Sequence, residues 1–201
     1  MKNFYIADLH FGHEMIIDFD GRPFASAGEM DAELIHRWNA AVGPGDTVYI
    51  LGDFCWGDEG EWMKILAQLR GSKVLLRGNH DPAAMSGALE AQFQDIRDIL
   101  TVRDGPYTAV LCHYPLMFYP DDRAPDTVML CGHVHLTPQN DYLTQWRAQI
   151  RGNKKEGRGS FGNIVNVGCM LPYMDYTPRT LEEILRAVPP WGQGYMTGNM
   201  R

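Results

Sequence analysis

Five short segments that carry metal-binding side chains each follow directly after a short, strongly apolar run of this 201-residue chain. They are Asp8-Leu9-His10, Gly52-Asp53, Gly78-Asn79-His80-Asp81, Cys112-His113 and Gly132-His133-Val134-His135. Short apolar runs of this kind are typical of buried β-strands. Ligands in an α/β protein collect beyond the carboxyl ends of its strands, so the pattern predicts a fold in which these strand ends meet. Together the segments supply enough nitrogen and oxygen ligands to surround two divalent cations.

The first part of the chain alternates strands with helices. Apolar runs predict strands over 4–7, 47–51 and 73–76, and the patterns between them predict helices over 26–42 and 59–69. Strand, helix and strand at these short spacings are typical of right-handed βαβ units and of a largely parallel sheet that is buried on both faces.

The helix expected over 26–42 has both a start signal and a buried face. Ser26 is its expected N-cap, and Glu29 follows three residues later as the second half of a capping box. Its apolar positions recur four residues apart, as an amphipathic helix requires, at Met30, Leu34 and Trp38.

Beyond residue 95 the pattern changes, because strands are expected with few helices between them. They are predicted over 99–102, 107–111, 128–130 and 164–167. This indicates a second sheet, so we expect an α/β fold with two mixed sheets packed face to face and helices outside, in αββα layers. A single domain is expected over 1–188, and a Gly-rich, polar tail over 189–201.

The segment 144–162 differs from its surroundings in having five basic residues interleaved with glycines. The basic residues are Arg147, Arg151, Lys154, Lys155 and Arg158. Its low apolar content predicts a loop that leaves the core. Two interpretations stay open, a solvated surface loop and a cationic flap that helps to hold an anionic substrate.

Composition excludes several classes of protein. The 45% hydrophobic and 21% charged residues are ordinary for a globular protein, and no apolar run approaches the roughly 20 residues that cross a bilayer. We therefore expect a cytoplasmic protein without a membrane partner. The four cysteines are scattered, which disfavours a zinc ribbon or a disulfide scaffold and indicates small buried side chains. A net charge of −7 argues against broad attraction to nucleic acid.

The local spacing of the ligands also has consequences for geometry. Asp8 and His10, like His133 and His135, are one residue apart, and an extended chain would point both members of each pair to the same side. Glycine comes directly before a ligand in three segments, at Gly52, Gly78 and Gly132. A close backbone approach at these places would favour a residue without Cβ.

In this order, the five segments resemble those of the calcineurin-like metallophosphoesterase superfamily, from residue 8 to about 168. The flanking stretches His10-Phe11-Gly12-His13 and Arg22-Pro23-Phe24 are similar to a small bacterial and phage subgroup. Asn166-Val167-Gly168 followed by Tyr176-Thr177-Pro178 resembles the closing strand and turn of such proteins. The resemblance implies the β-sandwich of that superfamily.

The resemblance also implies two divalent metal ions and a ligand set for each. The first ion is expected on Asp8, His10, Asp53 and His135. The second is expected on Asp53, Asn79, His113 and His133. Asp53 is then a bridging carboxylate between two cations about 3.5–4 Å apart. Nitrogen and oxygen donors without thiolate suit Mn, Fe, Zn, Co or Ni, and Mn or Fe is expected in the working enzyme.

The activity implied by the resemblance is hydrolysis of a phosphomonoester or phosphodiester by a metal-bridging hydroxide. His80 is expected to donate a proton to the leaving group or to stabilise the phosphoryl charge. Asp81 is expected to orient the His80 ring, to cap a helix that starts at Pro82, or to do both. His13 is expected either to contact the phosphate or to pack in its loop. Arg22 has the same two alternatives, with a structural ion pair as the second.

Other functions stay open at this point. Within the same chemistry, a nucleotide pyrophosphatase or nuclease is the alternative to a small phosphoester hydrolase, and the basic segment is the feature that favours a polyanionic substrate. A non-catalytic metal-binding interaction module is a different class, and a structural-metal protein is disfavoured because such sites prefer thiolates. A nucleic acid partner is therefore possible but not favoured, and the oligomeric state is open.

Overall fold

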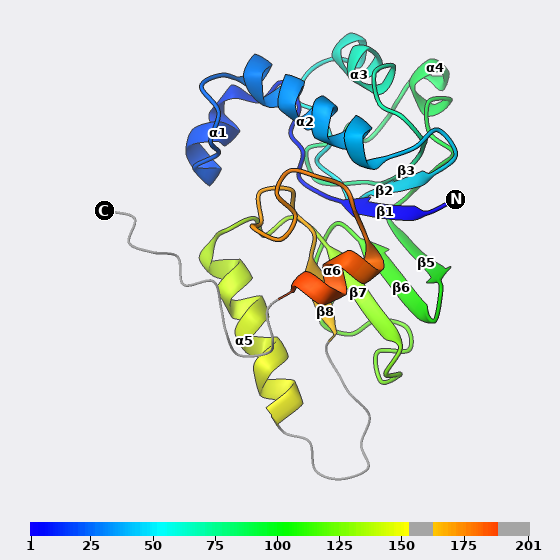
Figure 1. Ribbon diagram of the computed structural model, residues 1–201, viewed down its shortest axis with the longest axis vertical. Helices are drawn as coiled ribbons and strands as arrows, with labels where there is room; N and C mark the ends of the chain where they lie inside the picture. The colour runs from blue at the N-terminus through cyan, green and yellow to red at the C-terminus, as the bar shows by residue number, and fades with distance from the viewer. Residues whose placement is uncertain (153–162, 189–201) are drawn as a thin grey trace.

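A computed structural model describes residues 1–152 and 163–188, and of residues 148–152 it describes the backbone alone. Two β-sheets pack against each other with helices outside, as Figure 1 shows. Buried residues of both sheets belong to one hydrophobic core, with Ile6 and Ile50 from the first and Leu111 and Val128 from the second. The expected α/β sandwich of two mixed sheets is confirmed.

The first sheet has the strand order β4-β3-β2-β1-β9. Its strands are β1 (Asn3–Ile6), β2 (Thr47–Ile50), β3 (Ser72–Leu76), β4 (Asp95–Arg97) and β9 (Arg179–Thr180). Strands β1 to β4 run parallel and β9 is antiparallel at the edge. Ile6 is level with Ile50, and Ile50 is level with Leu75, so the carboxyl ends of the three predicted strands lie side by side.

The second sheet has the order β5-β6-β7-β8. Its strands are β5 (Ile99–Asp104), β6 (Tyr107–Cys112), β7 (Thr127–Cys131) and β8 (Ile164–Asn166), close to the four predicted ranges. Strands β6, β7 and β8 are parallel, and β5 is antiparallel to β6. The ligand segments after β6 and β7 therefore leave this sheet at the same edge.

Helices α2 (Ala27–Ala41) and α3 (Glu59–Leu66) cover the outer side of the first sheet (Figure 1). The Ser26 side chain accepts a hydrogen bond from the Glu29 N–H at 3.2 Å, as expected of the N-cap. The Glu29 carboxylate, however, accepts from the Ala25 N–H at 2.8 Å instead of closing the box at Ser26. The predicted apolar face of α2 is buried, at Met30, Leu34 and Trp38.

Four helices were not predicted from the sequence: α1 (Glu14–Asp20), α4 (Gly87–Glu90), α5 (Pro138–Gly152) and α6 (Leu181–Ala187). Helix α5 corrects the loop expected over 144–162, because residues 144–152 are helical. Leu143 and Trp146, three residues apart, pack on Val110 and Met129 of the second sheet, and this contact offsets the low overall hydropathy of the segment. The remainder of that segment, and the tail over 189–201, lie outside the described residues.

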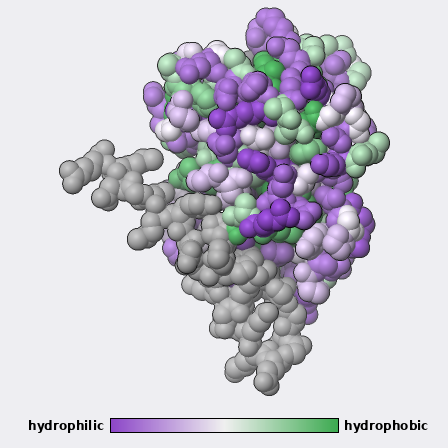
Figure 2. Space-filling view, viewed as in Figure 1, coloured by the Kyte–Doolittle hydropathy of each residue, from purple (hydrophilic) through white to green (hydrophobic). Residues whose placement is uncertain are grey.

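The surface and the cysteines agree with a protein that keeps its apolar side chains inside. The face in Figure 2 is mostly hydrophilic over the described residues, with hydrophobic residues scattered between. All four cysteines are buried and unpaired, as predicted. No helix in the described part of the chain has the length and apolarity that a bilayer crossing requires.

Candidate metal centre

The ligand segments of both sheets meet because the two sheets are joined at their carboxyl ends. The Ala7 N–H donates to the Val167 carbonyl at 2.9 Å, and the Val167 N–H donates to the Cys131 carbonyl at 2.7 Å. The chain after β1 is thereby linked to the ends of β7 and β8. Asp8 follows β1 and Asp53 follows β2, so these carboxylates reach the side chains that follow β6 and β7.

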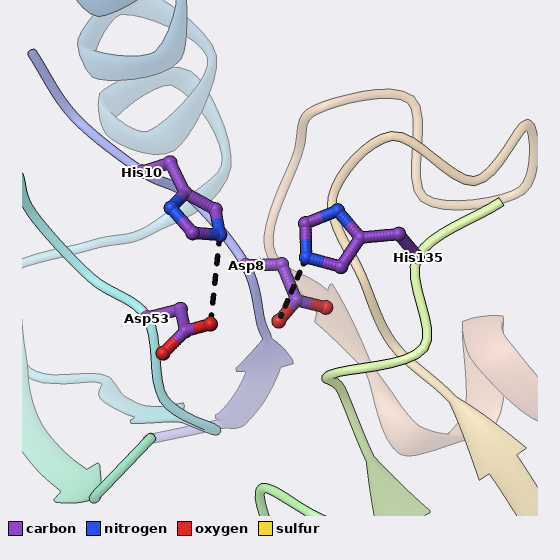
Figure 3. Close-up of side chains that lie close together, drawn as sticks. All are labelled: Asp8, His10, Asp53 and His135. Carbon is purple, nitrogen blue, oxygen red and sulfur yellow. Dashed lines mark ion pairs between the residues drawn. The ribbon is translucent and has the colours of Figure 1, made fainter. Parts of the chain in front are cut away.

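Four buried side chains form the first group, shown in Figure 3. One ligand atom from each of Asp8, His10, Asp53 and His135 lies within 4.8 Å of the others. His10 Nε2 is 3.6 Å from Asp53 Oδ2, and His135 Nε2 is 3.9 Å from Asp8 Oδ1. Two imidazoles and two carboxylates that converge on one buried space are a donor set that suits a divalent transition metal.

Two polar atoms of this group indicate whether a cation fits the site. Asp8 Oδ2 and His10 Nε2 are buried and have no hydrogen-bond partner in the described part of the protein. A buried polar atom without a partner costs about 1–3 kcal/mol, and more when it is charged. Burial raises the pKa of Asp8 and lowers the pKa of His10, and a lower pKa favours the neutral imidazole that a metal ligand requires. A cation between them would satisfy both atoms, so the residues fit a bound metal.

A second group lies around Asn79. The side-chain oxygen of Asn79 is 3.0 Å from His113 Nε2 and 2.8 Å from His133 Nδ1. His113 Nε2 is also 3.6 Å from Asp53 Oδ2, the same carboxylate oxygen that faces His10. Asp53 therefore lies between the two groups, at the place where a shared carboxylate would have to be. The structure thus brings together all seven side chains proposed as ligands.

The backbone of the ligand segments is not extended, so our expectation from the one-residue spacing is wrong in its geometry. Asp8, His10, Asp53, His133 and His135 have φ angles of 56°, 51°, 53°, 71° and 44°. Residues other than glycine rarely adopt this left-handed region, at a cost of about 1 kcal/mol or more each. The side chains of Asp8 and His10 meet because tight left-handed turns aim them inward.

The glycines before the ligands allow close packing of these turns, as predicted. A Cβ at Gly52 would lie 2.4 Å from His113 Nδ1, and one at Gly78 would lie 2.2 Å from Asp53 Oδ1. A Cβ at Gly132 would come within 2.9 Å of both Asp8 carboxylate oxygens. All three distances are shorter than any ordinary contact, so only glycine fits there.

Asp81 has a different environment from the two that we considered. Its carboxylate accepts hydrogen bonds from the N–H groups of Asp53, Phe54 and Gly78 at 3.0, 2.9 and 2.8 Å. The helix-cap hypothesis is wrong, because the next helix, α4, begins after Ser86. None of the hydrogen bonds of the described residues joins Asp81 to the His80 ring. The contacts of Asp81 instead hold the loop that carries Asp53 against the loop that carries Asn79.

Arg22 has the surroundings of a structural residue, which disfavours the phosphate contact that we gave as one of its two alternatives. Its side chain is buried, at 4% exposure, and cannot face a substrate. It donates to the backbone carbonyls of Asp8 and Leu9 at 2.9 Å each, and it forms an ion pair with Asp20 at 2.8 Å. The alternative of a structural ion pair is the one that the structure supports.

Asp20, which we missed, orients one of the proposed ligands. Its Oδ1 accepts a hydrogen bond from His135 Nδ1 at 2.8 Å, which leaves Nε2 of that ring directed at Asp8. Burial lowers the pKa of His135, but the hydrogen bond to Asp20 and the charge of Asp8 outweigh it and raise the pKa. His113 is oriented similarly, since its Nδ1 lies 2.8 Å from the Leu51 carbonyl. The only sequence signal for Asp20 was a carboxylate two residues before Arg22, in a helix that was not predicted.

His13 and His80 stand at the mouth of the site beside Trp56, another residue that we missed. The His13 ring stacks on Trp56 with a centroid distance of 4.1 Å and an interplanar angle of 8°. The centroid of the exposed His80 ring is 5.4 Å from both His10 and Trp56. Both histidines line a cavity of about 460 Å³ that also reaches Asp53 and His133. His13 therefore packs in its loop and faces the cavity at once. His36 is exposed on α2, away from the site.

Comparisons with known proteins agree with this arrangement. Residues 1–148 match the calcineurin-like phosphoesterase family. Gene 66 protein of Mycobacterium phage L5 is 37% identical over 170 residues, which cover 75% of this chain and 73% of the phage protein. The uncharacterized protein MJ1445 of Methanocaldococcus jannaschii is 40% identical over 82 residues, 40% of this chain and 47% of that protein. The chain thus spans about half the length of this archaeal relative.

A solved structure also has this fold. The protein AQ665 from Aquifex aeolicus, whose function is described as unknown, superposes with a TM-score of 0.65 at 25% sequence identity. The match covers 92% of this chain and 98% of the Aquifex chain. The likeness therefore extends over both sheets.

Proposed function

Because the chain belongs to the calcineurin-like phosphoesterase family, we propose that it is a metal-dependent hydrolase of a phosphomonoester or phosphodiester. The observation that carries this proposal is the buried group of Asp8, His10, Asp53 and His135, in which two polar atoms lack a partner among the described residues. A site that leaves such atoms unsatisfied is costly unless a cation completes it.

Two ions are proposed, the first on those four residues and the second on Asp53 together with Asn79, His113 and His133. When bound, two such ions supply an activated water nucleophile at neutral pH and positive charge for the phosphoryl oxygens. The donors are nitrogen and oxygen throughout, which favours Mn or Fe in the working enzyme and admits Zn, Co or Ni. The protein's own contribution is to hold the ligands in turns fixed by Asp20, Arg22 and Asp81.

His80 is proposed to donate a proton to the leaving-group oxygen. Its N–H donates to Asp53 Oδ1 at 2.9 Å, which fixes the residue beside the proposed bridging carboxylate. Its exposed ring lines the cavity, where an ester oxygen would arrive. Proton donation to a leaving group contributes typically 10²–10⁴-fold in rate, so we expect a loss of about this size without the ring.

The charge around the cavity favours a small substrate. None of the described residues that line it is Lys or Arg, and the chain has a net charge of −7. Compensation of the phosphoryl charge therefore falls to the proposed ions. A nucleic acid strand would present further phosphates, and the described residues around this cavity offer them no basic side chain, so a small phosphoester is favoured over a polyanion.

The test combines metal analysis with hydrolysis of bis-p-nitrophenyl phosphate and p-nitrophenyl phosphate in the presence of Mn. We expect close to two metals per chain and hydrolysis of at least one ester. His80→Ala should lose activity and keep its metals, whereas His36→Ala, a change at an exposed histidine of α2, should match the unaltered protein. Full activity in both His80→Ala and Asp53→Asn would refute the proposed site. Two bound metals with turnover of neither ester would favour the non-catalytic interaction module.

A further inference from the structure

We propose that an apolar cavity next to the metal centre is a substrate subsite for the uncharged aromatic or aliphatic group of a phosphoester. The proposal rests on the proposed function, because it assumes that the phosphoryl group lies at the ligand cluster. The proposal adds the substrate class, a phosphoester whose group in this cavity is apolar and uncharged.

The cavity has a volume of about 470 Å³ and lies between the loop after β6 and helix α5. Pro115 and Met117 form its wall on the loop side, and Tyr142, Leu143 and Trp146 form its wall on the helix. A cavity of this size is within the range of small-molecule sites, about 300–1,000 Å³. It is therefore large enough for an aromatic ring and too small for a folded partner.

The cavity adjoins the metal site. His133 and Gln139 line both this cavity and the one that contains Asp53 and His80. His133 is held firmly, because its N–H donates to Asp8 Oδ1 at 3.0 Å and its ring lies edge-on to Tyr114 at 4.7 Å. A group attached to a phosphoryl centre beside His133 can therefore extend past this ring into the second cavity.

The chemistry of the lining selects an apolar occupant. No Asp, Glu, Lys or Arg is among the described residues that line the cavity. Met117 and Tyr142 are 52% and 68% exposed, so apolar surface is presented to solvent beside a polar site. Exposed apolar surface in a concave place next to convergent polar groups is typical of a ligand site, and covering it releases water. A charged group would lose hydration there without gaining an oppositely charged partner among the described residues.

The experiment compares two phosphonates that differ only in the attached group. Phenylphosphonate and methylphosphonate are titrated into the Mn-loaded, full-length protein by isothermal titration calorimetry. Burying an aromatic ring should make phenylphosphonate bind roughly tenfold more tightly, or better. Met117→Asp should bring the ratio of the two affinities close to one. The added charge repels both phosphonates alike, so the ratio isolates the apolar contact.

A matched control is available next to Met117. Phe118 is 68% exposed and is not among the residues that line either cavity, so Phe118→Asp should keep the phenyl preference. Tyr142→Ala, on the opposite wall, should reduce it. Equal binding of the two phosphonates by the unaltered protein would overturn the subsite alone. An unchanged ratio in both Met117→Asp and Tyr142→Ala would also overturn it. If neither phosphonate binds, the proposed function fails together with the subsite.

Discussion

Replacing Asp20 with asparagine should weaken metal binding, although Asp20 is not itself a proposed ligand. The carboxylate of Asp20 accepts from His135 Nδ1 at 2.8 Å and from Arg22 Nε at 2.9 Å. His135 Nδ1 and Arg22 Nε both donate a hydrogen bond to Asp20, so each requires an acceptor. The side-chain amide of the Asp20→Asn variant would have one oxygen, which can accept from the permanently charged Arg22 or from the His135 ring, but not from both at their present positions.

The magnitude follows from which donor keeps the oxygen. Arg22 always carries its charge and is buried, so we expect the amide oxygen to face Arg22 and the amide NH₂ to face His135. The His135 ring would then carry its proton on Nε2, the atom that faces Asp8. Loss of such an outer partner typically costs 10–100-fold in metal affinity, which corresponds to about 1.4–2.7 kcal/mol.

The assay is titration of Mn or Zn into the metal-free protein, with affinity measured by calorimetry or by competition with a chelating dye. Asp18→Asn is the control, because Asp18 lies on the same helix, two residues away, and is exposed. Circular dichroism at the assay temperature shows whether each variant is folded. A folded Asp20→Asn protein that binds metal as tightly as the Asp18→Asn control would refute the proposed role of this carboxylate.

Three further outcomes are expected. Gly78→Ala should lower both metal content and thermal stability, because its Cβ would lie 2.2 Å from Asp53 Oδ1. Gly87→Ala, whose Cβ would have nothing within 4 Å, should change neither. Equal metal content in the two variants would contradict this prediction. Glu183→Gln should destabilise the protein by about 0.3–1 kcal/mol at neutral pH, since it keeps the oxygen that closes the capping box with Thr180 but removes a negative charge at the start of α6. Partial burial raises the pKa of Glu183, but hydrogen bonds from Thr180 outweigh it and lower the pKa from its ordinary 4.5, so this stabilisation is present above pH 4.5 and is lost as the pH falls below it. A destabilisation of the same size at pH 3, measured by urea unfolding, would contradict that assignment. Removal of metal by a chelator should lower the melting temperature, and added Mn should restore it in a concentration-dependent way. The reason is that an ion that binds only the folded protein stabilises the folded state. A melting temperature that does not respond to Mn would count against a metal site.

The parts of the fold that sequence patterns predicted are those where one strong local signal acts. Strands β1, β2 and β3 are short apolar runs, and their parallel pairing follows from the helices that connect them. Helix α2 combines an N-cap with a regular apolar face. Helix α5 has a start signal in Thr137 before Pro138, but its mean hydropathy is low, and the contacts of Leu143 and Trp146 with the second sheet hold it in place. Tertiary packing of this kind cannot be read from a local window.

The same division holds within the site. The proposed ligands follow apolar runs again and again along the chain, so Asp53 and His113 can be identified from the sequence. Residues that act through a ligand have no such pattern, because their partners are distant in sequence: Asp20 and His135 are 115 residues apart, and Asp81 and Asp53 are 28 apart. Two alternatives stayed open for Arg22 because its guanidinium suits phosphate, while the same planar group suits two backbone carbonyls and a carboxylate. Only its burial distinguishes the two uses.

The left-handed ligand positions connect these observations. Five ligands in a sparsely populated backbone region would together cost several kcal/mol, on the order of 1 kcal/mol or more each, so other contacts must hold them there. Those contacts are the ones that sequence patterns did not reveal: Arg22 binds the carbonyl of Asp8, and Asp81 binds the N–H of Asp53. In this view the strain, the buried Arg22–Asp20 pair and the Asp81 carboxylate form one support that holds the ligand atoms close together before a metal arrives. The support is built from the residues around the ligands, so variants of Asp20 or Asp81 should change metal affinity even though neither side chain is a proposed ligand.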